Sequence, residues 1–106
     1  PLTAFSAVEA QGVINTSCSP CHTVGNQRPN LRVLTDLVGV RSAQSRLVYI
    51  APGLRFDSYL WHKMNGSQGG ESAGPGRGSV MPRRGRLPDE IIERFGQWID
   101  ALPGND

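Results

Sequence analysis

Cys18-Ser19-Pro20-Cys21-His22 is the stretch that decides how this chain of 106 residues folds, because Cys18 and Cys21 are its only cysteines. Two cysteines at this spacing cannot form a disulfide that joins distant segments. The pair is suited to a local redox dithiol, to half of a metal site, or to covalent attachment of a cofactor. His22 follows directly and adds a third ligand-forming side chain.

The composition indicates that the chain needs help to form a core. Hydrophobic residues make up 38% of the chain and aromatic residues 7%, whereas the 13 glycines and 8 prolines together are about a fifth of it. A domain of this size buries roughly 60–70% of the surface of its unfolded chain. So few apolar side chains predict a disulfide, a metal or a large cofactor in the core of one domain that spans residues 1–106.

The Cys-x-x-Cys-His pattern is typical of covalent haem c attachment. In that chemistry Cys18 and Cys21 form thioethers with the two vinyl groups of the porphyrin, and His22 is the proximal ligand of the iron. The other ring nitrogen of such a histidine usually donates to a carbonyl group, which residues 25–30 would supply. We therefore expect one haem c per chain, and its apolar disc would replace the missing core.

Two other sites use closely spaced cysteines, and both fit this sequence less well. A thioredoxin-like dithiol needs a βαβ setting, and the sequence shows no such alternation of elements. A zinc site needs four ligands, and His62 is the only other histidine, so a carboxylate would have to complete the site. Two free neighbouring thiols would be prone to oxidation in an exported protein.

Helical signals dominate the rest of the sequence, which predicts the all-α class. Apolar residues at spacings of three and four predict a helix from residue 3 to about residue 17, with Thr3 or Ser6 as its N-cap. Residues 34–38 predict a short helix of two or three turns. A briefly extended stretch over residues 47–50 follows it.

Two further helices are predicted in the second half of the chain. Asp57 is a favourable N-cap for a helix over residues 58–64, and Gly66 stands where a left-handed residue commonly ends a helix. The last helix covers residues 88–102. Its apolar stripe consists of Ile91, Phe95, Trp98 and Leu102, widened by Ile92 and Ile99. Residues 66–85 contain seven glycines, which excludes regular structure between the two helices.

A low-spin haem iron needs a second axial ligand, and three side chains are candidates. Met64 shares an apolar helix face with Leu60 and Trp61, which favours a packing role. His62 would give a bis-histidine haem of lower reduction potential, but it is expected to be an ordinary, partly exposed helical histidine. Met81 lies in irregular chain just before the last helix, and such a segment can bring a thioether over the distal face. We favour Met81, with Met64 and His62 as the alternatives.

These features resemble the small single-haem class I c-type cytochromes, and the resemblance extends over nearly the whole chain. The segments that carry it are residues 18–22 with the helix before them, 51–53, 58–66, Met81-Pro82, and 87–90 leading to Trp98-Ile99. It implies the cytochrome c fold, with about four short helices and long loops wrapped around one haem, in which the first and last helices cross next to the haem. It also implies Cys18 and Cys21 as thioether sites, His22 as the proximal ligand and Met81 as the distal ligand.

The function that follows is electron transfer, by a soluble carrier or by the haem domain of a larger redox assembly, without enzymatic conversion of a substrate. The alternative is a gas-binding or sensing haem protein in which NO, CO or O₂ displaces Met81. A peroxidase is less suited, because His62 is the only histidine left to serve as a distal acid-base group.

The charge pattern bears on the partners. Eleven Lys and Arg against nine Asp and Glu give a net charge of +2, which does not suggest a nucleic-acid partner. The one basic cluster, Arg83, Arg84 and Arg86, either steers an acidic redox protein or consists of solvated charges and partners of the haem propionates. The sequence contains no run of about 18 apolar residues, so it predicts no transmembrane segment. Because haem c is attached to exported chains, we expect the periplasm or an equivalent compartment, with the export signal outside this sequence.

Overall fold

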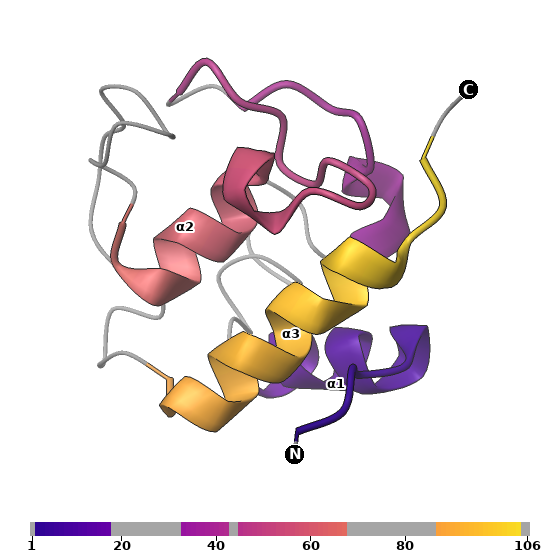
Figure 1. Ribbon diagram of the computed structural model, residues 1–106, viewed down its shortest axis with the longest axis vertical. Helices are drawn as coiled ribbons and strands as arrows, with labels where there is room; N and C mark the ends of the chain where they lie inside the picture. The colour runs from indigo at the N-terminus through magenta and orange to yellow at the C-terminus, as the bar shows by residue number, and fades with distance from the viewer. Residues whose placement is uncertain (1, 18–32, 43–44, 68–86, 105–106) are drawn as a thin grey trace.

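The computed structural model describes residues 2–17, 33–42, 45–67 and 87–104, and within them the chain is mainly helical. Its elements there are, in order, α1 (Ala7–Ser17), the 3-10 turns η1 (Leu34–Leu37) and η2 (Arg55–Asp57), α2 (Tyr59–Asn65) and α3 (Asp89–Ala101) (Figure 1). These residues form no strand, only isolated bridges that join Val38 to Ile50, Arg41 to Val48 and Val48 to Ser58. The predicted all-α class is confirmed for this part of the chain.

α1 begins after a capping box formed by Ser6 and Glu9. The Glu9 amide donates to Ser6 Oγ over 3.1 Å, and the Ser6 amide donates to Glu9 Oε1 over 2.9 Å. These bonds satisfy amides that have no partner within the first helical turn, so the helix starts at Ala7 rather than near residue 3. Of the two predicted N-caps, the structure uses Ser6.

The predicted helix over residues 34–38 is shorter than expected, because only the 3-10 turn η1 forms there. Val38 is already extended after this turn, and Gly39 follows with a φ of +77°. β-branched Val38 favours extended backbone, and its bridge to Ile50 replaces a second helical turn. The Gly39 amide donates to the Ile50 carbonyl over 2.9 Å, which ties this segment to the stretch predicted to be extended.

The start of α2 differs from the prediction, because Asp57 is not its N-cap. Ser58 occupies the N-cap position, and its side chain makes no capping bond to the helix. Instead, the first two amides of α2 donate to the backbone carbonyls of Val48 and Tyr49, over 2.9 and 3.1 Å. These carbonyls do what a capping side chain would do. At the other end, Gly66 has a φ of +83° and ends the helix as predicted.

α3 buries a face that is rotated from the predicted stripe. The buried residues of the helix are Ile92, Phe95, Gly96, Trp98 and Ile99. Ile91 and Leu102, which belonged to the centre of the predicted stripe, are only partly buried. The buried face includes Gly96 because the side chains of Arg55 and Trp61 pack closely on that position. Hydrophobic periodicity does not detect this contact, since glycine adds no apolar side chain.

α1 and α3 cross and share the core (Figure 1). The fully buried side chains of these two helices are Ala10, Ile14, Phe95 and Ile99. The chain before α1 is held on α3 as well, because the Phe5 amide donates to the Arg94 carbonyl over 3.2 Å. The Arg94 guanidinium also lies 4.4 Å from the centroid of the Phe5 ring. A contact between the first and last helices is the arrangement that the resemblance implied.

Candidate functional site

The side chains predicted to hold a haem lie outside the described residues: Cys18, Cys21, His22 and Met81, together with the cluster Arg83, Arg84 and Arg86. The structure does describe the chain on either side of them. α1 ends at Ser17, directly before the motif, and Leu87 packs against the core directly before α3. The motif is therefore joined to the end of a helix that is anchored in the core.

His62 is buried, with 2% of its surface accessible, and is not partly exposed as predicted. Its Nε2 lies 2.7 Å from the Phe56 carbonyl oxygen, and its Nδ1 lies 2.6 Å from Ser67 Oγ. A carbonyl oxygen only accepts hydrogen bonds, so the proton is assigned to Nε2, which donates to Phe56, while Nδ1 pairs with the Ser67 hydroxyl. Iron ligation by His62 would break one of these bonds, which argues against His62 as the distal ligand.

Met64 belongs to the hydrophobic core and is 2% exposed. It lies in the same cluster as Leu60 and Trp61, together with buried residues of α1 and α3. This is the packing role that the sequence favoured for Met64. Two of the three candidate distal ligands therefore have other roles in the structure.

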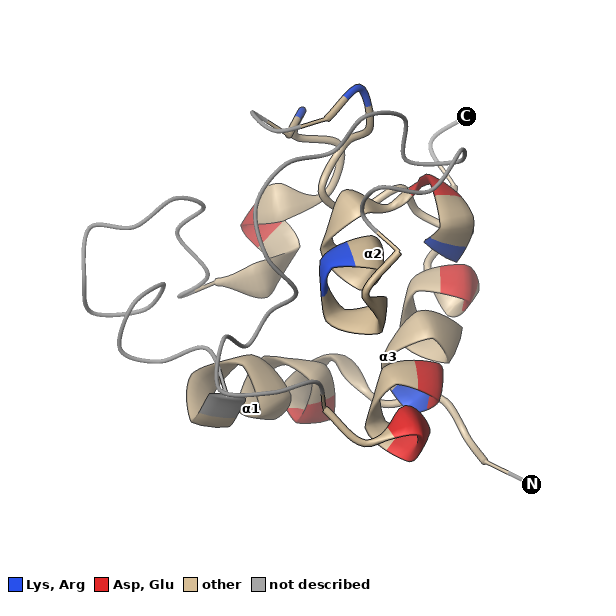
Figure 2. Cartoon of the chain, turned by 90° about the vertical axis from the view of Figure 1, so that its left-hand side faces the viewer, with Lys and Arg blue, Asp and Glu red and all other residues tan. Residues whose placement is uncertain are grey.

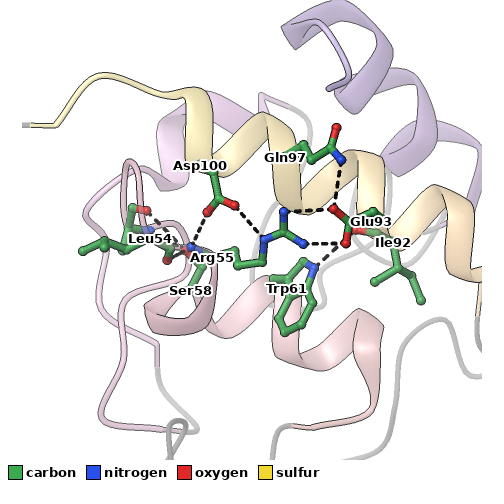
Figure 3. A network of polar contacts seen from close by, with 9 residues as sticks. Leu54, Arg55, Ser58, Trp61, Ile92, Glu93, Gln97 and Asp100 are labelled. Atoms are coloured by element: carbon green, nitrogen blue, oxygen red, sulfur yellow. Dashed lines mark hydrogen bonds and ion pairs between the residues drawn. The ribbon is translucent and has the colours of Figure 1, made fainter. Parts of the chain in front are cut away.

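A polar network that the sequence did not predict joins η2 to α3 (Figure 3). Arg55 Nε lies 2.7 Å from Asp100 Oδ2, and Arg55 Nη1 lies 2.8 Å from Glu93 Oε1. The Arg55 amide donates to Asp100 Oδ1, and Gln97 donates to Glu93 from one turn further along α3. Because η2 leads directly into α2, the network fixes the start of α2 on α3.

The contacts of Arg55 also shift the pKa values of two groups, Arg55 itself and Glu93. Hydrogen bonds from Arg55 lower the pKa of Glu93, and the hydrogen bond to Glu93 raises the pKa of Arg55 against the opposing effect of burial. Only 11% of the Arg55 side chain is exposed, compared with 42% for Glu93 and 41% for Asp100. The arginine is thus held between two carboxylates in fixed geometry, which distinguishes it from an ordinary surface ion pair worth about 0–1 kcal/mol.

Gly96 allows the arginine to approach α3. A Cβ atom at this position would lie 2.7 Å from Arg55 Nη1 and 2.8 Å from Trp61 Nε1. The Trp61 indole lies over the same turn and donates to the Ile92 carbonyl over 3.3 Å. A glycine inside an amphipathic helix, with a carboxylate on either side, was the sequence signal that could have revealed this contact.

In the part of the chain that the structure describes, no group of three or more His, Cys, Asp or Glu side chains is placed to bind a metal ion. None of the helices in that part is both long and apolar enough to cross a membrane. Comparison with protein-family models, with curated proteins and with solved structures found no match for this chain.

Proposed function

We propose that this protein transfers electrons through one covalently attached haem c, on a cytochrome c fold. Cys18 and Cys21 form the thioethers, His22 is the proximal ligand of the iron, and Met81 is the distal ligand. The observation that carries the proposal is the Cys-x-x-Cys-His motif at residues 18–22, which follows directly on α1.

The buried row of α1 supports attachment at this point. Ala10 and Ile14 stand four residues apart, and both are fully buried. The same spacing continued by one step reaches Cys18 in the sequence, directly after the last residue of α1. A cofactor attached to Cys18 would therefore be joined to a helix that is anchored in the core.

The donor set fits the proposed group. Two thiols three positions apart match the two thioether bonds, and an imidazole directly after the second thiol is a suitable iron ligand. The hydrogen bonds of His62 and the core packing of Met64 support Met81 as the distal ligand, because the other two candidates have competing roles.

When bound, haem c supplies a one-electron couple between ferric and ferrous iron. The chain contributes the two thioethers that hold the porphyrin and the imidazole of His22. The thioether of Met81 raises the reduction potential above that of a bis-histidine site. His22 and Met81 would both bind the iron and leave no place on it for a substrate, so a carrier fits this donor set better than an enzyme does.

The proposed setting follows from the chemistry of attachment. Haem c is joined to exported chains, so the protein works in the periplasm or an equivalent compartment. Its partners are redox proteins, and Arg83, Arg84 and Arg86 favour acidic ones.

A pyridine haemochrome assay tests the proposal. We expect one bis-thioether haem per chain that stays bound after denaturation. The double substitution Cys18→Ser with Cys21→Ser should abolish attachment, whereas Ser19→Ala, between the two thiols, should leave it intact. A parent chain without covalent haem would overturn the proposal.

Carbon monoxide separates a carrier from the alternative, a gas-binding or sensing protein. Slow or absent CO binding to the reduced protein at neutral pH is expected for a carrier, because Met81 occupies the distal position. Rapid binding would favour the sensing function, in which Met81 is displaced.

A further inference from the structure

Two apolar side chains at the η2 turn are exposed to solvent. Phe56 is 62% exposed, and Leu54, which directly precedes the turn, is 55% exposed. Among the large apolar side chains in the described part of the chain, only Val8 is more exposed than Phe56. Two such side chains at one turn mark it as a candidate interaction surface.

The backbone of this turn is held in place from several sides. The Leu54 carbonyl accepts a hydrogen bond of 2.9 Å from the Ser58 hydroxyl, and the Phe56 carbonyl accepts one of 2.7 Å from His62 Nε2. Between these two residues, Arg55 is bound to α3 through both its amide and its side chain (Figure 3). A partner that binds here therefore does not have to order the turn first, which lowers the entropic cost of association.

The Phe56 ring has a rigid support. It meets the Trp61 ring edge-on, with 5.4 Å between the centroids, and the central guanidinium carbon of Arg55 lies 6.0 Å from its centroid. Trp61 is only 7% exposed and donates to the Ile92 carbonyl of α3. Aromatic residues are enriched in interfaces, and a supported ring loses little freedom on binding. Phe56 is therefore suited to anchor a partner.

The charges that face solvent at this turn are negative. Asp57 is exposed and directly follows Phe56. Glu93 and Asp100, which both bind Arg55, have 42% and 41% of their side chains exposed, whereas Arg55 has 11%. The positive charge is thus largely covered and the negative charges are not, although the chain as a whole has a net charge of +2. The complementary surface on a partner is therefore cationic.

We propose that this surface docks a partner protein that presents apolar side chains flanked by lysines and arginines. The η2 surface consists of Leu54, Phe56, Asp57, Glu93 and Asp100. Phe56 is its apolar anchor, and the carboxylates select the charge of the partner. A small area with one aromatic anchor suits a transient complex. The inference uses η2 and α3 alone, so it goes beyond the proposed electron transfer and does not depend on the haem ligands.

A synthetic amphipathic peptide built from leucine and lysine is the probe, added to the haem-loaded protein. We expect it to bind and to shift the NMR signals of η2 and of the Trp61 indole, which lies against the Phe56 ring, while the amide signals of α1 stay in place. Replacing the lysines of the peptide with glutamates, or its leucines with serines, should weaken binding, because the η2 surface offers negative charge together with an apolar anchor.

Serine substitutions test the apolar part of the surface. Phe56→Ser should weaken binding of the peptide about five- to thirtyfold, because it removes the anchor and leaves the backbone bonds of the turn in place. Leu54→Ser is a second variant at the same turn and should change the affinity in the same direction. Val8→Ser is the matched control, because Val8 is 82% exposed on α1, and it should leave the affinity unchanged.

Asp57→Asn tests the charge. It should weaken binding about twofold at low salt and have no effect at high salt, because salt screens charges at an exposed site. Asp36→Asn is the matched control, because Asp36 is an exposed carboxylate on η1. It should leave the affinity unchanged at both salt concentrations.

Two results would contradict the docking role. Equal affinity of the parent and Phe56→Ser, or shifted signals centred on α1, would show that the peptide does not use the η2 surface. Self-association of the parent that Phe56→Ser abolishes, measured by analytical ultracentrifugation, would assign the surface to a second copy of this chain instead. Haem content is measured on the same samples, so a failure of the proposed function is detected separately.

Discussion

At the scale of single residues, Gly96 sets the distance between η2 and α3. Two rigid groups occupy the space of a side chain there, because Arg55 is held by two carboxylates and the Trp61 indole is bonded to α3. We expect Gly96→Ala to lower the free energy of unfolding by about 1–3 kcal/mol, although alanine is the better helix former. Chemical denaturation of the haem-loaded protein measures this change.

Gly12 is the matched control, because it also lies inside a helix and a Cβ atom there meets nothing within 4 Å. Gly12→Ala should raise the free energy of unfolding by about 0.5–1 kcal/mol. If the two substitutions have the same sign, Gly96 is not under the steric constraint described above.

The two methionines have different expected roles, Met81 as an iron ligand and Met64 as a core residue. Met81→Ala should abolish the near-infrared band from sulfur to ferric iron, because it removes the proposed ligand. Met64→Ala should keep the band and lower the free energy of unfolding by about 2–5 kcal/mol, because it leaves a cavity in the core. The reverse pattern in the absorption spectra would show that Met64 is the ligand.

At the scale of elements, the Arg55 network makes the packing of η2 on α3 depend on pH. Arg55 lowers the pKa of Glu93 from its ordinary value of 4.5, so the folded state binds this proton less readily than the unfolded state. The resulting stabilisation is fully present above pH 4.5 and is lost as the pH falls through the lowered pKa of Glu93. In the Glu93→Gln variant, the free energy of unfolding should therefore depend less on pH below pH 4.5.

Unfolding measured between neutral pH and pH 3 checks this prediction, with Glu90→Gln as the control. Glu90 is an exposed carboxylate on the same helix. If Glu93→Gln and Glu90→Gln change the acid side equally, the ion pair with Arg55 contributes nothing specific.

The elements predicted well from the sequence are those whose signals are local. Ser6 and Glu9 lie three residues apart and specify the start of α1, and Gly66 specifies the end of α2. The start of α2 could not be predicted in this way, because its cap consists of backbone carbonyls about ten residues earlier in the chain, at Val48 and Tyr49. A backbone carbonyl is present at every residue, so no sequence pattern marks the ones that act as a cap.

The same difference between local and distant contacts decides which parts of the candidate site the sequence predicts. The motif at residues 18–22 is local, and the sequence alone suffices to propose its chemistry. The burial of His62 is not local, because it results from packing against η2 and Ser67, and a single helix turn gives no sign of it. The Arg55 network joins Arg55 to Glu93 and Asp100, which stand 38 and 45 positions further along the chain. In the sequence these three residues look like ordinary charged residues.

At the scale of the whole molecule, the described core is small, and the proposed haem would supply much of the remaining apolar contact. The double substitution Cys18→Ser with Cys21→Ser should therefore leave the chain largely unfolded. Far-UV circular dichroism and thermal unfolding measure this, with the haem-loaded Ser19→Ala variant as the reference. A cooperative unfolding transition in the double variant would show that the chain forms its core without haem.

Charge is also distributed unevenly along the chain. α3 carries four acidic residues and one basic residue, Arg94, and acidic positions recur along this helix in Figure 2. The sequence just before α3 contains Arg83, Arg84 and Arg86. If these three arginines steer an acidic partner, replacing all three by glutamine should flatten the dependence of the electron-transfer rate on ionic strength.

Arg41→Gln with Arg46→Gln is the control, because both arginines are exposed on a different loop. Stopped-flow rates with an acidic redox protein at rising salt concentrations provide the measurement. A slope that stays the same in the triple variant would assign these arginines to solvent or to the haem propionates.

The pairing of the first and last helices has a consequence for the order in which contacts form during folding. Arg94 donates to the Thr3 carbonyl across 91 positions, whereas the Leu34 amide donates to the side chain of Gln11 across only 23. Contacts between residues far apart in the sequence form more slowly, because the chain between them must first be closed into a loop. We therefore expect α1 to meet η1 early and α3 late in folding.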